Sequence, residues 1–299
     1  MATFTSEHPL LKRTPGDIAR RVACTQMVLT RWGIEAALTS SQGKGPVDPR
    51  IEQSYGALAK AIEESKLSRS FTSVEQELID KPLGQWSPVD DLASQSMRWE
   101  SFGTLLWAIK ILNSLPKFHV RFSQELLFQS TAIVPAFPTT ITSFLQYFDS
   151  GEGSKPSHIV TPDELRSAVN TAEAWYWRAR AQIVLDLKES LEGDSEDIKA
   201  ARKKIPSGLK TIMANLDQAL SQASIRASAD GYIDEIVGED FGVDGVAYRK
   251  LDDHGIRDMS DISEYRLAAL SWLCGRDWEF KRGEVPFIHP LGSLWAPEE

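Results

Sequence analysis

The chain has 299 residues and a formal net charge of −9, and 42% of its residues are hydrophobic and 25% charged. This composition is typical of a globular protein that buries a large core, and it excludes disorder as the main state. Because the averaged acidic charge repels phosphate backbones and anionic lipid, we expect no nucleic-acid partner and no membrane partner.

Two observations predict a cytoplasmic location. Residues 1–12 lack the apolar run of a signal peptide. The longest apolar stretches are interrupted by Lys110 and by Pro135 and Pro138. Neither stretch could cross a bilayer, which takes about 20 apolar residues.

Capping residues mark four helix starts. Thr14-Pro15-Gly16-Asp17 and Thr161-Pro162-Asp163-Glu164 each place a hydroxyl at the N-cap, a proline at the first helical position and an acid three residues after the cap. Thr72 and Glu75 form a capping box without proline, and Asp48-Pro49 supplies a cap and a proline. We therefore expect helices to begin at these four points.

Apolar residues recur at helical spacing along most of the chain. The helix that opens at Thr161 is expected to be the longest, because neither proline nor glycine interrupts it before Gly193. The last helix is expected to begin near Ser260 or Asp261 and to end at Gly275. Further helices are expected over about 96–112, 141–148 and 209–223.

Evidence for strands is confined to residues 241–251, which predict at most a small β-hairpin. The fold class is therefore all-α, a single-domain multi-helix bundle, because the apolar faces on both sides of each linker need a partner to cover them. We expect an extension over 1–13, a helical domain over 14–280 with a helical insertion at 193–231, and a proline-rich tail over 281–299 that packs on the body.

Most signatures of chemistry are missing from the sequence. No Gly-x-Gly-x-x-Gly motif occurs, and the five histidines are scattered without a pair at ligand spacing. We therefore expect no metal and no cofactor.

The chain contains nine tryptophans, several of them beside charged residues. In a helix Glu100, Thr104 and Trp107 fall on one face, so a carboxylate and an indole could share a cleft. By the same geometry, a polar stripe opposite the apolar face of the long helix contains Arg166, Asn170, Glu173, Trp177 and Arg180.

Four blocks of sequence resemble, in order, the domain-of-unknown-function family numbered 4272. They are Gly16–Ala23, Met97–Ala108, Glu164–Ala168 and Tyr265–Leu273 with Asp277-Trp278 after it. The resemblance implies a helical domain with no reaction or ligand to transfer. The positions that match the family pattern are Arg20 or Arg21, Glu100, Trp107, Arg166, Arg266, Trp272 and Trp278. This chain departs from the family by its insertion over 193–231 and by Glu279 in place of aspartate.

Two functional hypotheses follow, beside the alternative that these residues only fill a core and form structural ion pairs. In the first, the protein binds a small molecule or a protein partner in a groove between helices. The expected groove residues are Trp107, Arg166, Trp177, Arg266, Trp272 and Trp278. In the second, it is a metal-free isomerase, cyclase or hydrolase with Glu100 as general acid or base. The sequence leaves the oligomeric state open.

Overall fold

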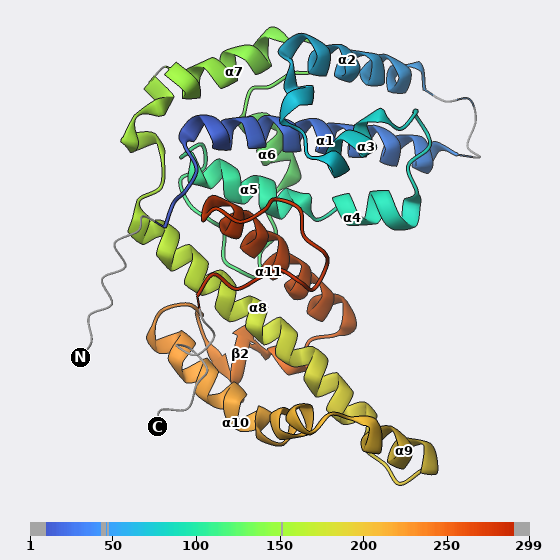
Figure 1. The fold of residues 1–299 in the computed structure, drawn as a ribbon, viewed down its shortest axis with the longest axis vertical. Coiled ribbons are helices and arrows are strands. Elements are labelled where there is room, and N and C mark those ends of the chain that lie inside the picture. Colours follow the sequence, from blue (N-terminus) through green and yellow to red (C-terminus); the bar gives the residue numbers. More distant parts are fainter. Residues whose placement is uncertain (1–9, 43–45, 47, 151, 290–299) are drawn as a thin grey trace. The chain divides into compact units, whose positions relative to one another are not determined.

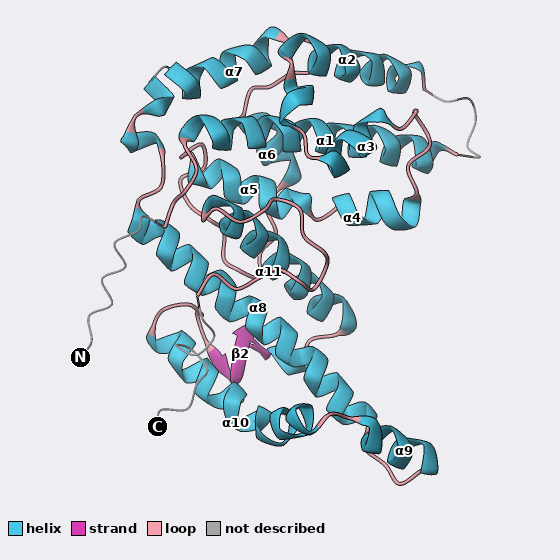
Figure 2. Ribbon diagram, in the orientation of Figure 1, coloured by secondary structure: helices cyan, strands magenta, loops and turns pink. Residues whose placement is uncertain are grey.

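The computed structural model describes residues 10–42, 46, 48–150 and 152–289. Helices dominate this part of the chain, and the strands form one small sheet (Figures 1 and 2), as the all-α prediction requires. The α-helices are α1 (Pro15–Ser41), α2 (Pro49–Ser65), α3 (Ser73–Asp80), α4 (Ala93–Gln95), α5 (Arg98–Ala108), α6 (Gln124–Ser130), α7 (Thr139–Ser150), α8 (Pro162–Ser190), α9 (Glu196–Lys204), α10 (Ser207–Ala229) and α11 (Asp253–Leu273). The strands are β1 (Ile236–Val237), β2 (Asp240–Val243) and β3 (Val246–Ala247).

Backbone contacts divide the chain into two compact units. Unit 1 contains Met1–Arg166 and Ala268–Val285, and unit 2 contains Ser167–Leu267 and Pro286–Glu299. Helices α8 and α11 each contribute residues to both units. The segments expected at 1–13, 14–280 and 281–299 stay a prediction, and the two units are described separately below.

The four predicted helix starts are confirmed. The hydroxyl of Thr14 accepts a hydrogen bond from the amide of Asp17, and Thr72 and Glu75 form the same reciprocal pair at the start of α3. Asp48 accepts from the amide of Arg50 at the start of α2. Each cap satisfies an amide that the helix itself leaves unpaired, so the local sequence determines where these helices begin.

The predicted start of the last helix is wrong by seven residues or more. Helix α11 begins at Asp253, because the carboxylate of Asp252 accepts from the amide of Gly255 and so caps the helix. Gly255 disfavours a helix by its intrinsic propensity, and the cap offsets that cost.

In unit 1, α1 is the central helix. It contacts α2, α5 and α7, with α2 and α7 on one side and α5 on the other (Figure 1). Buried apolar residues of α1 such as Ala23 and Met27 pack with Leu58 of α2 and Ile141 of α7. Burial of this stripe supplies the main stabilisation of the unit.

In unit 2, α8 and α10 pack against each other beside the small sheet. Ala181 and Leu185 of α8 form an apolar cluster with Leu216 and Leu220 of α10. The sheet is antiparallel in the order β1-β2-β3, and Val243 pairs with Val246. It is slightly larger than the predicted hairpin, since β1 begins at Ile236.

Candidate functional site

The structure places Glu100 inside unit 1, where it supports a loop. Its side chain is in α5 and only 2% exposed, and its Oε1 accepts a hydrogen bond of 3.1 Å from the amide of Phe122. The ring of Phe122 lies so close to Gly103 that a Cβ there would be 2.6 Å from it. Glu100 thus satisfies a buried backbone amide in the segment before α6.

Trp272 and Trp278 lie together in unit 1 and are both buried. Their rings meet edge to face, with centroids 5.8 Å apart. The indole nitrogen of Trp278 donates to Oε1 of Glu75 at 3.1 Å, and the guanidinium carbon of Arg21 lies 5.1 Å from its ring centroid. The same Glu75 binds Arg21 through Oε2 at 2.6 Å. These tryptophans therefore belong to a buried ionic network.

The ionic network also connects the segment after α11 to the rest of unit 1. Nη1 of Arg98, in α5, lies 3.6 Å from Oε1 of Glu75, and its Nη2 lies 2.9 Å from Oε2 of Glu279. The other carboxylate oxygen of Glu279 accepts a hydrogen bond of 2.6 Å from the hydroxyl of Thr72. A buried network of this kind specifies how segments dock, and removing one member leaves a charge without its partner.

Three further predicted residues lie on three different helices. Trp107 is buried in α5 of unit 1, and Arg266 is buried in the part of α11 that belongs to unit 2. Arg166 is exposed and pairs with Asp163 in the same turn of α8. Of the predicted residues in unit 1, Trp272 and Trp278 are brought into mutual contact.

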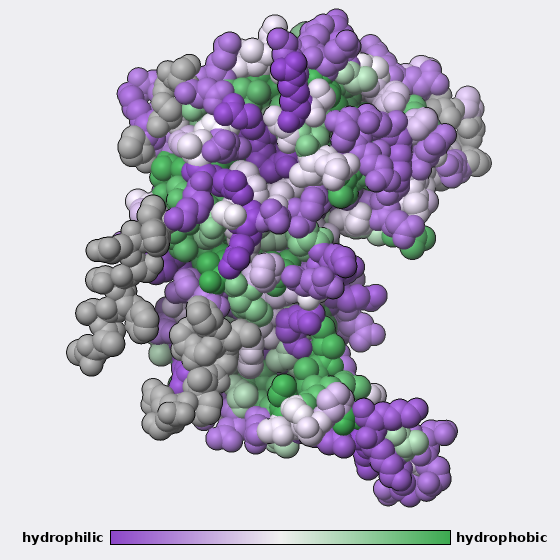
Figure 3. Space-filling view, in the orientation of Figure 1, coloured by the Kyte–Doolittle hydropathy of each residue, from purple (hydrophilic) through white to green (hydrophobic). Residues whose placement is uncertain are grey.

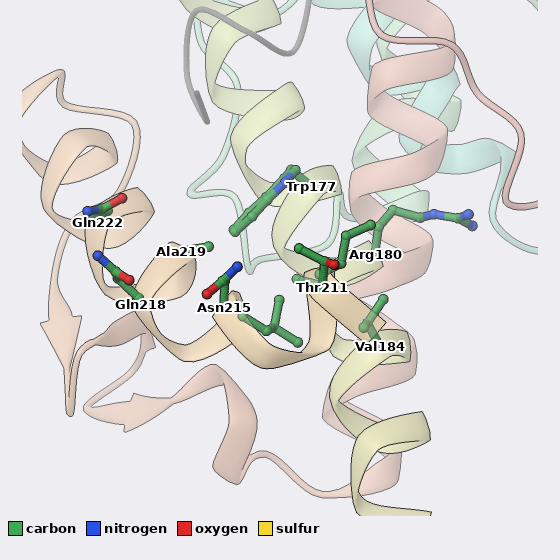
Figure 4. Close-up of a pocket in the computed structure, with 11 residues that line it drawn as sticks. Trp177, Arg180, Val184, Thr211, Asn215, Gln218, Ala219 and Gln222 are labelled. Carbon is green, nitrogen blue, oxygen red and sulfur yellow. The ribbon is translucent and has the colours of Figure 1, made fainter. Parts of the chain in front are cut away.

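Trp177, one of the predicted groove residues, lines a groove in the structure. The groove lies between α8 and α10 in unit 2 and has a volume of about 750 Å³. Figure 4 shows the indole projecting from α8 toward Asn215 and Ala219 of α10. The full lining consists of Trp177, Arg180, Ala181, Val184, Thr211, Ile212, Asn215, Leu216, Gln218, Ala219 and Gln222.

The two walls of this groove, the α8/α10 groove, differ in chemistry. The α8 wall offers the flat face of Trp177 and the aliphatic side chains of Ala181 and Val184. Along α10, uncharged polar side chains recur at offsets of four, three and four residues, which places them on one stripe of the helix. They are Thr211, Asn215, Gln218 and Gln222.

Large aliphatic side chains of α8 and α10 are exposed. Ile212 of α10, which lines the groove, is 54% exposed, and Ile183 of α8, outside the lining, is 55% exposed. Figure 3 shows hydrophobic surface over the region of α8 and α10, in contrast to the hydrophilic surface of α9. Concave apolar surface with a few polar groups is typical of a ligand site.

Arg180 is the one charged side chain in the described lining of the groove. Its guanidinium points away from Trp177, while its aliphatic stem lies beside Thr211 (Figure 4). No carboxylate or histidine lines the described groove. The groove is therefore equipped to hold a molecule by packing and hydrogen bonds rather than to move protons.

A buried ion pair beside Trp177 holds α8 against the sheet. Arg178 donates to both carboxylate oxygens of Asp240, at 2.5 and 2.7 Å, and both side chains are fully buried. Burial by itself raises the pKa of Asp240, but the hydrogen bonds and charge of Arg178 lower it, and the net pKa lies below its ordinary value. Arg178 also lies 4.2 Å from the ring centroid of Tyr248. The pair fixes the helix that presents Trp177.

Sequence reasoning named Trp177 and placed Arg180 on its stripe, but it missed the α10 wall. The signal for this wall was present as the regular spacing of Thr211, Asn215, Gln218 and Gln222 on a helix whose other face is apolar. The stripe alone is typical of any solvated helix face, and only the packing of α10 against α8 makes it a groove wall.

No family model, curated protein or solved structure matches this chain. The resemblance to family 4272 therefore stays a prediction. Within the described part of the chain, no cluster of three or more potential metal-ligating histidines, cysteines or acids occurs. None of the described helices combines the length and hydropathy that a membrane span requires.

Proposed function

We propose that this protein binds a small, uncharged, partly aromatic molecule in the α8/α10 groove. The observation that carries the proposal is the juxtaposition of the Trp177 indole with the polar stripe of α10 across a groove of about 750 Å³. Sites for drug-sized ligands have volumes of about 300–1,000 Å³, apolar walls and a few orienting polar groups. A planar ligand would stack on Trp177 and exchange hydrogen bonds with Asn215, Gln218 or Gln222.

The lining chemistry favours an uncharged ligand. Asn, Gln and Thr side chains both donate and accept hydrogen bonds, so they match amide, hydroxyl and carbonyl groups without a compensating charge. A cationic ligand would lose hydration without gaining an ion pair, because no carboxylate lines the described groove, and Arg180 directs its guanidinium away from Trp177. The metal-free enzyme hypothesis has weaker support, because Glu100 is engaged by a backbone amide in unit 1 and does not line the groove.

Binding of an uncharged fluorescent probe tests the proposal. Nile red, a planar neutral dye, should bind the wild-type protein with increased emission. Replacing Ala219 by leucine fills the groove, and replacing Trp177 by alanine removes the stacking surface, so each change should weaken binding about tenfold. Ala229→Leu, on the same helix but at its exposed C-terminal end, is the matched control and should bind as the wild type does.

A fragment screen by ligand-observed NMR then identifies the chemical class. Competition of uncharged aromatic fragments with Nile red supports the proposal. Equal binding by Ala219→Leu and wild type, or a lack of binding by every uncharged aromatic compound, would overturn it. We also propose that the protein acts in the cytoplasm, as the sequence predicts, and cell fractionation with a specific antibody tests that location.

A further inference from the structure

A second cavity lies where α8 ends and α10 begins. It has a volume of about 400 Å³ and is lined by residues of α8, α9, α10 and their connections, all in unit 2. Its apolar residues are Leu191, Ile205, Met213 and Ala214, and its charged residues are Lys188, Arg202, Lys210 and Glu192. Three cations and one carboxylate thus surround a small apolar floor, in a protein whose net charge is −9.

This cavity, the α8–α9 end cavity, is separate from the α8/α10 groove. Lys210 lines the cavity and Ala219 lines the groove. They are nine residues apart, which corresponds to two and a half helical turns, so they project from opposite sides of α10. Met213, which lines the cavity, and Gln222, which lines the groove, are also nine residues apart and project from opposite sides of the helix. The two concave surfaces therefore lie on opposite flanks of one helix.

Arg202 forms two hydrogen bonds to backbone carbonyls, and its Nη1 donors make none within the described chain. Its Nε donates to the carbonyl of Leu191 at 2.7 Å, and its Nη2 donates to the carbonyl of Gly193 at 2.9 Å. These bonds satisfy carbonyl groups that follow the end of α8 and fix the guanidinium. Its Nη1 makes no hydrogen bond with any described residue, so two N–H donors remain for a bound group.

The two lysines that line the cavity, Lys188 and Lys210, differ in whether they form an ion pair. Nζ of Lys188 lies 2.7 Å from a carboxylate oxygen of Asp217, so much of its charge is already balanced. The ammonium of Lys210 forms no ion pair within the described chain. Lys210 and Arg202 are therefore the cations that an incoming anion could engage.

The start of α10 adds a favourable field at this cavity. Its N-cap is Pro206, which offers no side-chain cap, so the first amides of this 23-residue helix are left without a capping side chain. Ile205 and Lys210, which line the cavity, flank this helix start in the sequence. The positive end of a helix dipole favours an anion, and Lys210, the fourth residue of this helix, lines the cavity together with Arg202.

We propose that the α8–α9 end cavity binds an anion that carries a short apolar body, such as a medium-chain carboxylate. The carboxylate contacts Arg202 and Lys210, and the apolar body covers Leu191, Ile205 and Met213. Glu192 lies on the same rim and disfavours a second negative charge, which selects a monoanion. This site is independent of the proposed ligand of the groove.

Calorimetry with octanoate tests the site, with octanol as the uncharged counterpart. Octanoate should bind the wild-type protein, and octanol should bind at least tenfold more weakly. Lys210→Met keeps the aliphatic stem and removes the charge, and it should weaken octanoate binding about fivefold. Lys204→Met removes an equal charge from the exposed end of α9 and should leave binding unchanged.

The outcomes separate this site from the groove. Unchanged octanoate affinity in Ala219→Leu supports a separate cavity, and lost affinity in that variant would overturn it. Equal binding of octanol and octanoate, or equal weakening by Lys204→Met and Lys210→Met, would also overturn the proposal. Arg202→Met provides a second test, read together with its circular dichroism spectrum because Arg202 also supports the backbone.

Discussion

Replacing Arg178 by methionine should strongly destabilise unit 2. Methionine keeps much of the side-chain volume but removes both hydrogen bonds to the fully buried Asp240. Removal of one partner of a buried ion pair costs about 3–5 kcal/mol, because the remaining charge stays buried without its counterion. Asp240 keeps hydrogen bonds from the amides of Phe241 and Arg249 and a 3.4 Å ion pair with Nε of Arg249, which places the expected cost near the lower limit.

Urea unfolding of the full chain, followed by circular dichroism, measures this cost. With a denaturant dependence of about 1–3 kcal/mol per molar urea, a loss of about 3 kcal/mol lowers the midpoint of the affected transition by about 1 M or more. Arg180→Met is the matched control, because Arg180 lies on the same helix and is exposed. It should change the free energy of unfolding by less than about 0.5 kcal/mol.

The pH dependence provides a second readout of the same pair. In the wild type the lowered pKa of Asp240 means that its stabilisation is present above about pH 4 and is lost as the pH falls through the folded-state pKa. Without Arg178, burial raises that pKa, so protonation relieves the buried charge. The difference in stability between wild type and Arg178→Met should therefore shrink between pH 7 and pH 4. Equal midpoints for Arg178→Met and Arg180→Met, or a difference that grows toward pH 4, would refute this reasoning.

Two further predictions concern unit 1. Gly103→Ala places a Cβ about 2.6 Å from the ring of Phe122 and should cost about 1–3 kcal/mol, more than the gain of up to about 1 kcal/mol from higher helix propensity. Gly56→Ala in α2, where a Cβ meets nothing within 4 Å, is the control and should leave the urea midpoint unchanged or raise it. An unchanged urea midpoint in Gly103→Ala would contradict the close approach of Phe122 to Gly103. The second prediction concerns Glu164, whose pKa is lowered to about 2, chiefly by the hydrogen bond from Lys110. The ionised Glu164 therefore stabilises the fold fully above pH 4.5, and this contribution is lost between pH 4.5 and about 2. NMR titration of Glu164 should show this lowered pKa and its return toward 4.5 in Lys110→Met, whereas ordinary titration of the wild type would disprove the assignment.

Sequence patterns predicted local structure well where the determinants lie within one turn. The caps at Thr14, Asp48 and Thr72 place helix starts correctly, because each cap and its amide are two or three residues apart. Helix α11 begins at Asp253, before the predicted start near Ser260 or Asp261, because the carboxylate of Asp252 accepts from the amide of Gly255.

The candidate site was predictable only in part, because its second wall depends on tertiary packing. The geometry that places Glu100, Thr104 and Trp107 on one helix face is sound, and all three side chains are buried. Glu100 accepts a hydrogen bond from the backbone amide of Phe122, a contact that the sequence pattern could not indicate. Periodicity tells which side chains share a face, but it does not tell what covers that face.

The distribution of charge explains why the α8/α10 groove is the better candidate site. In unit 1 the indole of Trp278 donates to Glu75, and Glu100 accepts from the amide of Phe122. In unit 2 Arg178 donates to Asp240. Such pairs stabilise a particular packing and leave little capacity for a ligand. Amide side chains along an exposed helix stripe keep both donors and acceptors available to an incoming molecule. A tryptophan that faces such a stripe across a concave surface is therefore stronger evidence for binding than a tryptophan beside a buried charge.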